Sequence, residues 1–119
     1  LAEPHDNHVQ AYIDTPGAVY VSPSAYEGYD FYDELCRFNI VAKVSWPNRG
    51  DPVTAMQLKL IEGFNEYEAA SALVQAAGRG MRHDTDWCHT WVLDESVNML
   101  IARTRGTLPS WFTAALRWE

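Results

Sequence analysis

Short apolar runs alternate with segments of helical periodicity along this chain, and that order is the strongest constraint on its fold. The apolar runs that fit buried strands are residues 18–21, 37–44 and 87–93. The segments with helical spacing or helix-end signals are residues 8–13, 52–62, 67–77, 95–103 and 110–118. Strands separated by helices pair in parallel, because a parallel connection needs a long crossover. The sequence therefore predicts an α/β fold in which helices cover both faces of a parallel sheet.

Local signals mark the start of one helix and the buried side of the next. Asp51 precedes Pro52, which is the pattern of an N-cap residue followed by proline at the first helical position. In the following helix, apolar residues at spacings of three and four predict an apolar face made of Tyr67, Ala70, Val74 and Ala77.

Composition predicts one folded unit spanning residues 1–119, because 47% of the residues are hydrophobic and five are tryptophan. No run approaches the ~20 apolar residues of a membrane span, and the first residues lack the features of a signal peptide. Two cysteines are too few for a disulfide framework and suit a reducing cytosol. We therefore expect a cytoplasmic protein without membrane contact. The chain begins with Leu1 rather than methionine, which suggests a fragment of a longer protein.

The formal net charge of −7 argues against a dedicated nucleic-acid-binding module, because such modules are usually basic. An acidic domain can still contact a strand through backbone amides and hydroxyl groups on one small face. The charge lowers the expected affinity for DNA without excluding contact.

Two short motifs carry the chemistry. Residues 75–82 read Gln-Ala-Ala-Gly-Arg-Gly-Met-Arg, and residues 26–30 read Tyr-Glu-Gly-Tyr-Asp. The guanidinium groups of Arg79 and Arg82 can donate bidentately to phosphate oxygens. Side chains three residues apart lie on one face of a helix end, so both could reach one anion. The plainer interpretation is a helix C-terminus broken at Gly78, with two solvated arginines favoured by the helix dipole.

These motifs resemble motif VI (Q-x-x-G-R-x-x-R) and motif V (Glu-Gly-x-Asp) of the superfamily 2 helicases. They have the order and the separation of about 50 residues found in the DinG/XPD-type DNA helicases, and they suit phage members especially. The similarity spans roughly residues 17–113. It includes three further elements, Pro47-Asn-Arg-Gly-Asp-Pro52, Asp84-Thr-Asp86 and Val92-Leu-Asp94.

The resemblance implies the later part of the second RecA-like domain of an ATP-dependent DNA helicase. By this resemblance, Arg79 and Arg82 approach the γ-phosphate and neutralise charge that develops in phosphoryl transfer. Gln75 is expected near the attacking water, and Gly78 to allow close backbone approach. Ligands in such sheets bind at the carboxyl ends of the strands, and both motifs begin where a strand or helix gives way to a loop.

Motif V is expected to lie between the nucleotide site and the DNA groove. The resemblance places Glu27, Gly28 and Asp30 on the nucleotide side, with Asp30 as the main contact to the nucleotide or to a motif arginine. Ser22 and Ser24 fit two interpretations equally well, as donors to DNA phosphates or as local turn caps.

The chain contains no G-x-x-x-x-G-K-[S/T] phosphate-binding loop. The resemblance places that loop and the acidic Mg²⁺-binding motif in the first RecA-like domain, so ATP and Mg²⁺ would be held mainly there. We therefore expect the chain to be inactive alone. The implied whole protein hydrolyses ATP and moves 5′ to 3′ along single-stranded DNA, in a bacterial or phage-infected cell.

The expected partners are single-stranded DNA and the N-terminal RecA-like domain of the same protein. Few residues are left for the strands that normally precede motif V, so an open sheet edge and an apolar face should favour self-association. Two alternatives stay open. One is a non-catalytic nucleic-acid or protein interaction module with a RecA-like fold, and the other is a helicase that acts on RNA.

A few further residues invite a functional interpretation. Asp84 and Asp86 fit the turn before the third strand, either as caps of which one holds Arg82, or as solvated acids. Trp46 fits packing better than stacking on a base. A zinc site would have to draw on His5, His8, His83, Cys88 and His89. Their spacings match no common ligand set, so we predict no metal site.

Overall fold

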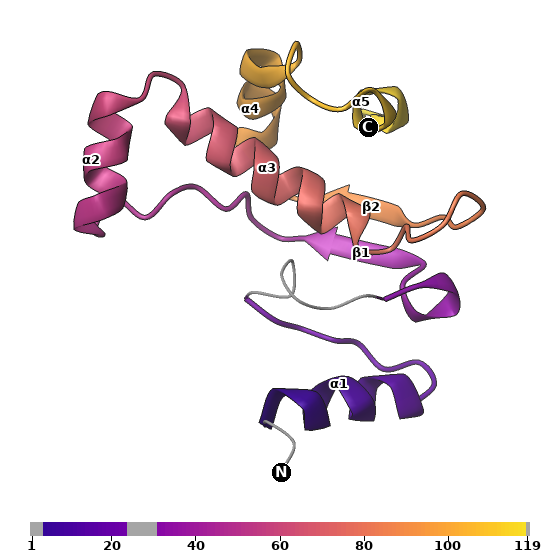
Figure 1. Cartoon of the computed structure of the whole chain (residues 1–119). Helices are drawn as coiled ribbons and strands as arrows, with labels where there is room; N and C mark the ends of the chain where they lie inside the picture. Colours follow the sequence, from indigo (N-terminus) through magenta and orange to yellow (C-terminus); the bar gives the residue numbers. More distant parts are fainter. Residues whose placement is uncertain (1–3, 24–30, 119) are drawn as a thin grey trace.

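A computed structural model describes residues 4–23 and 31–118 of the chain (Figure 1). Its elements in order are α1 (Pro4–Asp14), the 3₁₀ helix η1 (Asp33–Leu35), β1 (Phe38–Val41), α2 (Pro52–Leu60), α3 (Phe64–Gly78), β2 (His89–Val92), α4 (Ser96–Thr104) and α5 (Ser110–Ala115). In Figure 1, α1 lies below the sheet and α2 projects from its left end. None of the helices in the described residues combines the length and the apolar character needed to cross a lipid bilayer.

The two strands pair in parallel, from Phe38 opposite His89 to Val41 opposite Val92. The chain passes from β1 to β2 through α2 and α3, which form the long crossover that parallel pairing needs. The strands lie within the apolar runs 37–44 and 87–93, and the predicted α/β class is confirmed.

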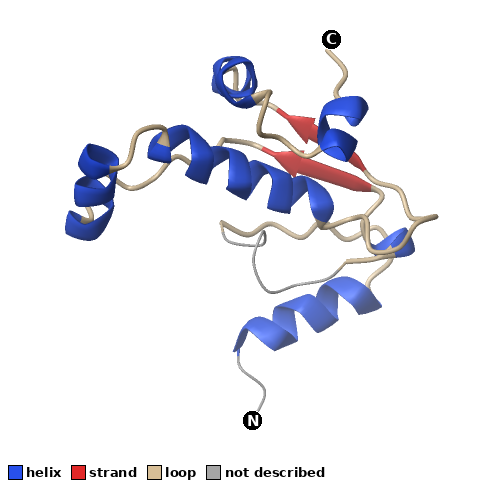
Figure 2. Ribbon diagram, turned by 45° about the horizontal axis from the view of Figure 1, so that its top comes forward, coloured by secondary structure: helices blue, strands red, loops and turns tan. Residues whose placement is uncertain are grey.

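One face of the sheet shares a core with α3, α4 and α5. Val41 and Val92 on this face pack against a cluster in which Leu100 is fully enclosed. The buried members of the cluster are Val44, Ala69, Ala70, Leu73, Val97, Leu100, Ile101 and Phe112. Figure 2 shows α3 running along the two strands.

The opposite face of the sheet is exposed in the part of the chain that the structure describes. Phe38 and Ile40 on β1 and Trp91 on β2 alternate with the core-facing residues and are accessible to solvent. The prediction that helices cover both faces is therefore wrong for the described residues. The physical reason is that α3, α4 and α5 all bury their apolar sides in the same core.

The predicted strand at residues 18–21 does not form. The segment is extended and makes no strand pairing with the described residues, and Val19 and Val21 are 84% and 87% exposed. The ring of Tyr20 packs instead against Tyr12 of α1, with ring centroids 5.7 Å apart. This aromatic contact holds the segment across a groove of about 1030 Å³ from β1.

Predictions for two side chains in the β1–α2 region are confirmed. The carboxylate of Asp51 caps α2 by accepting a 2.8 Å hydrogen bond from the N–H of Thr54, and Pro52 occupies the first turn. Trp46 packs against the core, and its indole N–H donates to Ser96 Oγ at 3.2 Å. Its indole is therefore a packing group that is tied to the start of α4.

The apolar face that the sequence predicts for α3 is wrong at one position. Tyr67 of α3 is 66% exposed. The helix is rotated so that Ala69 and Leu73 are buried together with Ala70. The other two residues of the predicted face, Val74 and Ala77, pack against the core.

We expect the chain to self-associate through the exposed face of the sheet, because apolar surface beside an open strand edge favours contact between molecules. Ile40→Lys places a charge in the middle of this face and should lower the average mass measured by light scattering over a concentration series. Leu60→Lys on the exposed side of α2 is the matched control and should lower the mass less. A native chain that stays monomeric at every concentration would contradict the expectation.

Candidate functional site

Residues 79–88 connect α3 to β2, and we call residues 79–87 the arginine loop because they contain Arg79 and Arg82. The loop leads directly into β2, so it lies at the amino ends of both parallel strands (Figure 1). The general expectation for open parallel sheets is a site at the carboxyl ends of the strands. That expectation is wrong for this motif, because α3 carries the chain back from the carboxyl end of β1 to the amino ends of the strands.

The end of α3 is fixed to the sheet by a side chain of β1. Asn39 Nδ2 donates a 2.8 Å hydrogen bond to the carbonyl oxygen of Ala76, one of the last carbonyls of the helix. The same amide nitrogen lies 3.5 Å from Thr90 Oγ1 on β2. Contacts to both strands therefore fix the point at which the arginine loop begins.

The two motif arginines do not share a helix face, so the spacing argument is wrong at Arg82. α3 ends at Gly78, and the chain turns at Arg79, whose N–H donates to the carbonyl of Ala76 at 3.3 Å. Arg82 lies beyond this turn, where helical spacing no longer applies. Arg79 is half-buried, whereas Arg82 is exposed, as is Gln75 on the last turns of α3.

Gly80 makes the closest contact between the arginine loop and the strands. A Cβ atom at this buried position would lie 2.5 Å from Cys88 Sγ and 2.9 Å from the carbonyl oxygen of Cys36. Glycine is therefore the residue that fits here without displacing its neighbours. At Gly78, where the resemblance implied close backbone approach, a Cβ atom would meet nothing within 4 Å beyond its chain neighbours and the backbone of its own helix.

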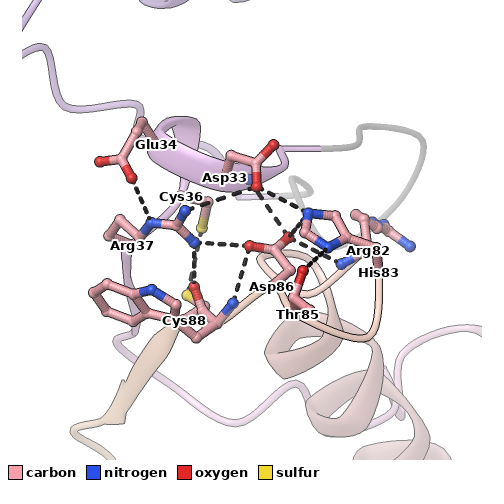
Figure 3. A network of polar contacts seen from close by, with 10 residues as sticks. Asp33, Glu34, Cys36, Arg37, Arg82, His83, Thr85, Asp86 and Cys88 are labelled. Atoms are coloured by element: carbon pink, nitrogen blue, oxygen red, sulfur yellow. Dashed lines mark hydrogen bonds and ion pairs between the residues drawn. The ribbon is translucent and has the colours of Figure 1, made fainter.

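The carboxylate of Asp86 organises the arginine loop from within (Figure 3). Its side chain is fully buried. The two oxygens accept hydrogen bonds from the backbone N–H groups of Arg82 at 3.1 Å, Asp33 at 3.4 Å and Trp87 at 2.9 Å. Asp86 is thus a cap of the turn before β2 and holds Arg82 through its backbone, whereas the alternative of a solvated acid is wrong for this residue.

Arg37, which immediately precedes β1, is the charged partner of that carboxylate. Its Nη1 atom lies 2.7 Å from Asp86 Oδ1 and donates to the carbonyl oxygen of Trp87 at 2.8 Å. Its Nε atom donates to Glu34 at 3.0 Å, and the guanidinium lies over the Trp87 ring, 4.7 Å from the centroid. One side chain therefore joins η1, β1 and the arginine loop.

A second contact joins the same segments at the surface. His83 Nε2 lies 2.8 Å from Asp33 Oδ1, and His83 Nδ1 lies 3.0 Å from Thr85 Oγ1. Asp33 has a backbone φ of +50°, a left-handed conformation that is uncommon for a residue with a side chain. The hydrogen bond to Asp33 raises the pKa of His83 above its ordinary value.

Two opposing effects act on the pKa of Asp86. Burial alone would raise it, but the ion pair with Arg37 and the three backbone hydrogen bonds outweigh burial and lower the pKa to about 2. The carboxylate is therefore ionised throughout the neutral range, and the contact between the arginine loop and residues 33–37 persists there.

Asp33, His83 and Asp86 bring potential ligand atoms within 4.8 Å of one another. Both oxygens of Asp86 already accept hydrogen bonds from protein groups, and Arg37 contributes a cation to the cluster. The hydrogen bonds of the chain account for this arrangement, and we assign it no metal ion.

The predicted site residues divide into three sets. Ser24, Glu27, Gly28 and Asp30 lie outside the described residues. Ser22 and Arg79 both line the groove beside β1. Gln75, Gly78 and Arg82 lie on the end of α3 or in the arginine loop.

The sequence analysis missed Arg37 and Asp33. A signal for the first was present, because Asp33 and Glu34 stand four and three residues before Arg37, a spacing that allows ion pairs in a helical turn. No local signal connects either residue with Asp86, which is about 50 positions away in the sequence.

A family model described as "Helicase C-terminal domain" matches residues 2–115. No curated protein and no solved structure matches the chain.

We expect Asp86 to make folding stability depend on pH in the acid range. Because its folded pKa of about 2 lies below the ordinary value of 3.8, the stabilisation is complete above about pH 4 and is lost as the pH falls through 2. Asp86→Asn should therefore be less stable than the native chain at pH 7, and its stability should fall less between pH 5 and pH 2. Urea unfolding followed by tryptophan fluorescence measures both effects.

Asp84→Asn is the matched control for this prediction, because Asp84 is an exposed acid in the same loop. It should retain the acid dependence of the native chain. An Asp86→Asn variant that keeps the full native pH dependence would show that Asp86 does not stabilise the loop.

Proposed function

Because the chain belongs to the helicase C-terminal domain family, we propose that it supplies one half of the ATP site of a helicase. In this proposal the arginine loop faces the nucleotide, and Arg79 and Arg82 neutralise charge on the transferred phosphoryl group. The whole protein is then an ATP-dependent DNA helicase of the DinG/XPD type. The type, and the phage origin that goes with it, rest on the motif resemblance alone.

The anchoring of the arginine loop is the observation that supports this proposal best. Charge stabilisation is efficient only when the donor is held in place before the reaction, since reorganisation would otherwise oppose it. The buried carboxylate of Asp86 fixes the backbone of Arg82, while the hydrogen bond from Asn39 fixes the end of α3 next to Arg79. Solvated arginines at a helix end would need neither anchor.

The remaining parts of the nucleotide site are proposed to come from elsewhere. The N-terminal RecA-like domain of the same protein would hold ATP and Mg²⁺ through a phosphate-binding loop, a motif that this chain lacks. Gln75 would lie near the attacking water. Gly78, Glu27, Gly28 and Asp30 would complete the nucleotide contacts from this side of the cleft.

Single-stranded DNA is proposed to bind on the same domain, with Ser22 and Ser24 as donors to its phosphates. The support is that Ser22 lines the groove of about 1030 Å³ beside β1, which Arg79 also lines. A net charge of −7 implies that these contacts are few and rely on hydroxyl and backbone donors.

A non-catalytic interaction module is the second candidate, and two observations favour it. The charge is unfavourable for nucleic acid, and apolar surface is exposed both on the sheet and along α2. A phosphate-binding lysine and an acidic Mg²⁺ motif in the upstream part of the gene would support the helicase instead.

We expect the 119-residue chain to show no ATP hydrolysis and only weak nucleotide binding. The physical reason is that most ground-state contacts to ATP belong to the proposed first domain. A phosphate-release assay and calorimetric titration with Mg²⁺–ATP measure these two properties. Hydrolysis that persists in an Arg79→Ala, Arg82→Ala double variant would contradict the half-site model.

In the full-length helicase, Arg79→Ala or Arg82→Ala should lower kcat for ATP by roughly 10³-fold or more, the usual contribution of a catalytic arginine. The KM for ATP should change much less, because the lost interaction belongs to the transition state. Lysine should restore activity poorly at either position, since it keeps the charge but loses the planar fork. Steady-state ATPase kinetics test all three expectations.

Arg105→Ala, at an exposed position that follows α4, is the matched control and should leave kcat unchanged. A thermal melt shows whether each variant is folded. Normal kcat in a folded double variant of Arg79 and Arg82 would end the proposal for the arginine loop.

A further inference from the structure

Two cysteine side chains meet at the amino ends of the strands. The Sγ atoms of Cys36 and Cys88 are 3.6 Å apart, although the residues lie 52 positions apart in the sequence. Cys36 stands just before β1 and Cys88 just before β2, and both are half-buried free thiols. Parallel pairing of the strands brings them together, and Figure 3 shows both sulfur atoms beside the Arg37–Asp86 ion pair.

The thiol pair is in contact with the arginine loop through Gly80. Gly80 packs so closely on Cys88 that a Cβ atom would lie 2.5 Å from its sulfur. In the part of the chain that the structure describes, the two thiols have no third residue that would complete a metal site with them. The chemistry of the pair is therefore that of a dithiol.

The two thiols differ in reactivity. A hydrogen bond from Cys88 stabilises the thiolate of Cys36 and lowers its pKa to about 7, although burial opposes this effect. The same hydrogen bond raises the pKa of Cys88, and burial adds to that effect. A thiol with a pKa near ambient pH is well suited to attack a disulfide. This difference favours Cys36 as the attacking group and Cys88 as the resolving group.

We propose that Cys36 and Cys88 form a reversible modification site that low-molecular-weight disulfides, such as oxidised glutathione, convert to an intramolecular disulfide that restrains the arginine loop. The Cys36 thiolate attacks one sulfur of the oxidant, the oxidant's S–S bond breaks, and one thiolate leaves and takes up a proton. Cys88 then loses its proton and attacks Cys36 Sγ, which expels the second thiol. Two protein thiols are oxidised by two electrons, and one disulfide is reduced to two thiols.

Bond formation has a direct effect on the arginine loop. A disulfide needs its sulfurs about 2.05 Å apart, so the two atoms must approach each other by about 1.6 Å. The movement occurs against Gly80 and tethers the start of β2 to the segment that carries Arg37. The oxidised loop is then held covalently as well as by the Asp86 carboxylate, whether or not it serves ATP hydrolysis.

Intact-mass spectrometry of the 119-residue chain after incubation with oxidised glutathione tests the modification. The native chain should lose two hydrogen atoms and carry no glutathione, whereas Cys36→Ser and Cys88→Ser should each retain one glutathione adduct. The same reaction in urea is the control, and there the native chain should accumulate adducts. Stable adducts on the folded native chain would overturn the proposal.

Two further measurements test the roles of the thiols and the effect on the loop. At pH 7, a limiting amount of iodoacetamide should modify Cys36 of the native reduced chain at least about tenfold more than Cys88, as located by peptide mass spectrometry, and equal modification would overturn the assigned order of attack. Amide hydrogen exchange in residues 79–87 should slow on oxidation and recover with a reducing thiol, and unchanged exchange would overturn the restraint.

Discussion

The burial of one carboxylate, that of Asp86, is the constraint on which the geometry of the arginine loop depends. A carboxylate leaves water only when charge and hydrogen bonds replace its hydration. Arg37 and three backbone N–H groups provide that replacement, and they come from both sides of the contact between residues 33–37 and the arginine loop. If the arginine loop moved away from residues 33–37, the Asp86 carboxylate would lose two of these partners at once, Arg37 and the N–H of Asp33. Its position is therefore fixed more firmly than its exposure suggests.

The parts of the fold that local sequence determines could be predicted. The cap at Asp51 and the parallel pairing of β1 with β2 follow from nearest neighbours and from the spacing of apolar runs. The capping role of Asp86 belongs to the same class, because a turn before a strand commonly recruits an aspartate. For the candidate site, the motif letters point to the loop of residues 79–87, and the role of Arg79 and Arg82 in phosphoryl transfer stays a prediction.

Other features depended on contacts between distant residues. Residues 18–21 have the composition of a strand, but the ring of Tyr20 packs against α1 and draws the segment away from β1. The spacing of Arg82 from Arg79 predicts that both lie on one helix face, yet α3 stops where Asn39 binds its last turn. Nothing near Arg37 in the sequence predicts its ion pair with Asp86, because the two residues become neighbours only when the strands pair.

The hydrogen bond from Asn39 to the last turn of α3 has a mechanical consequence. A helix that slides along a sheet by one turn moves by about 5.4 Å, which is far beyond the reach of a hydrogen bond. Sliding would therefore break this hydrogen bond, so we expect the strands, α3 and the start of the arginine loop to move as one body. If the proposed nucleotide cleft opens and closes, the two arginines should then follow the movement of this body as a whole.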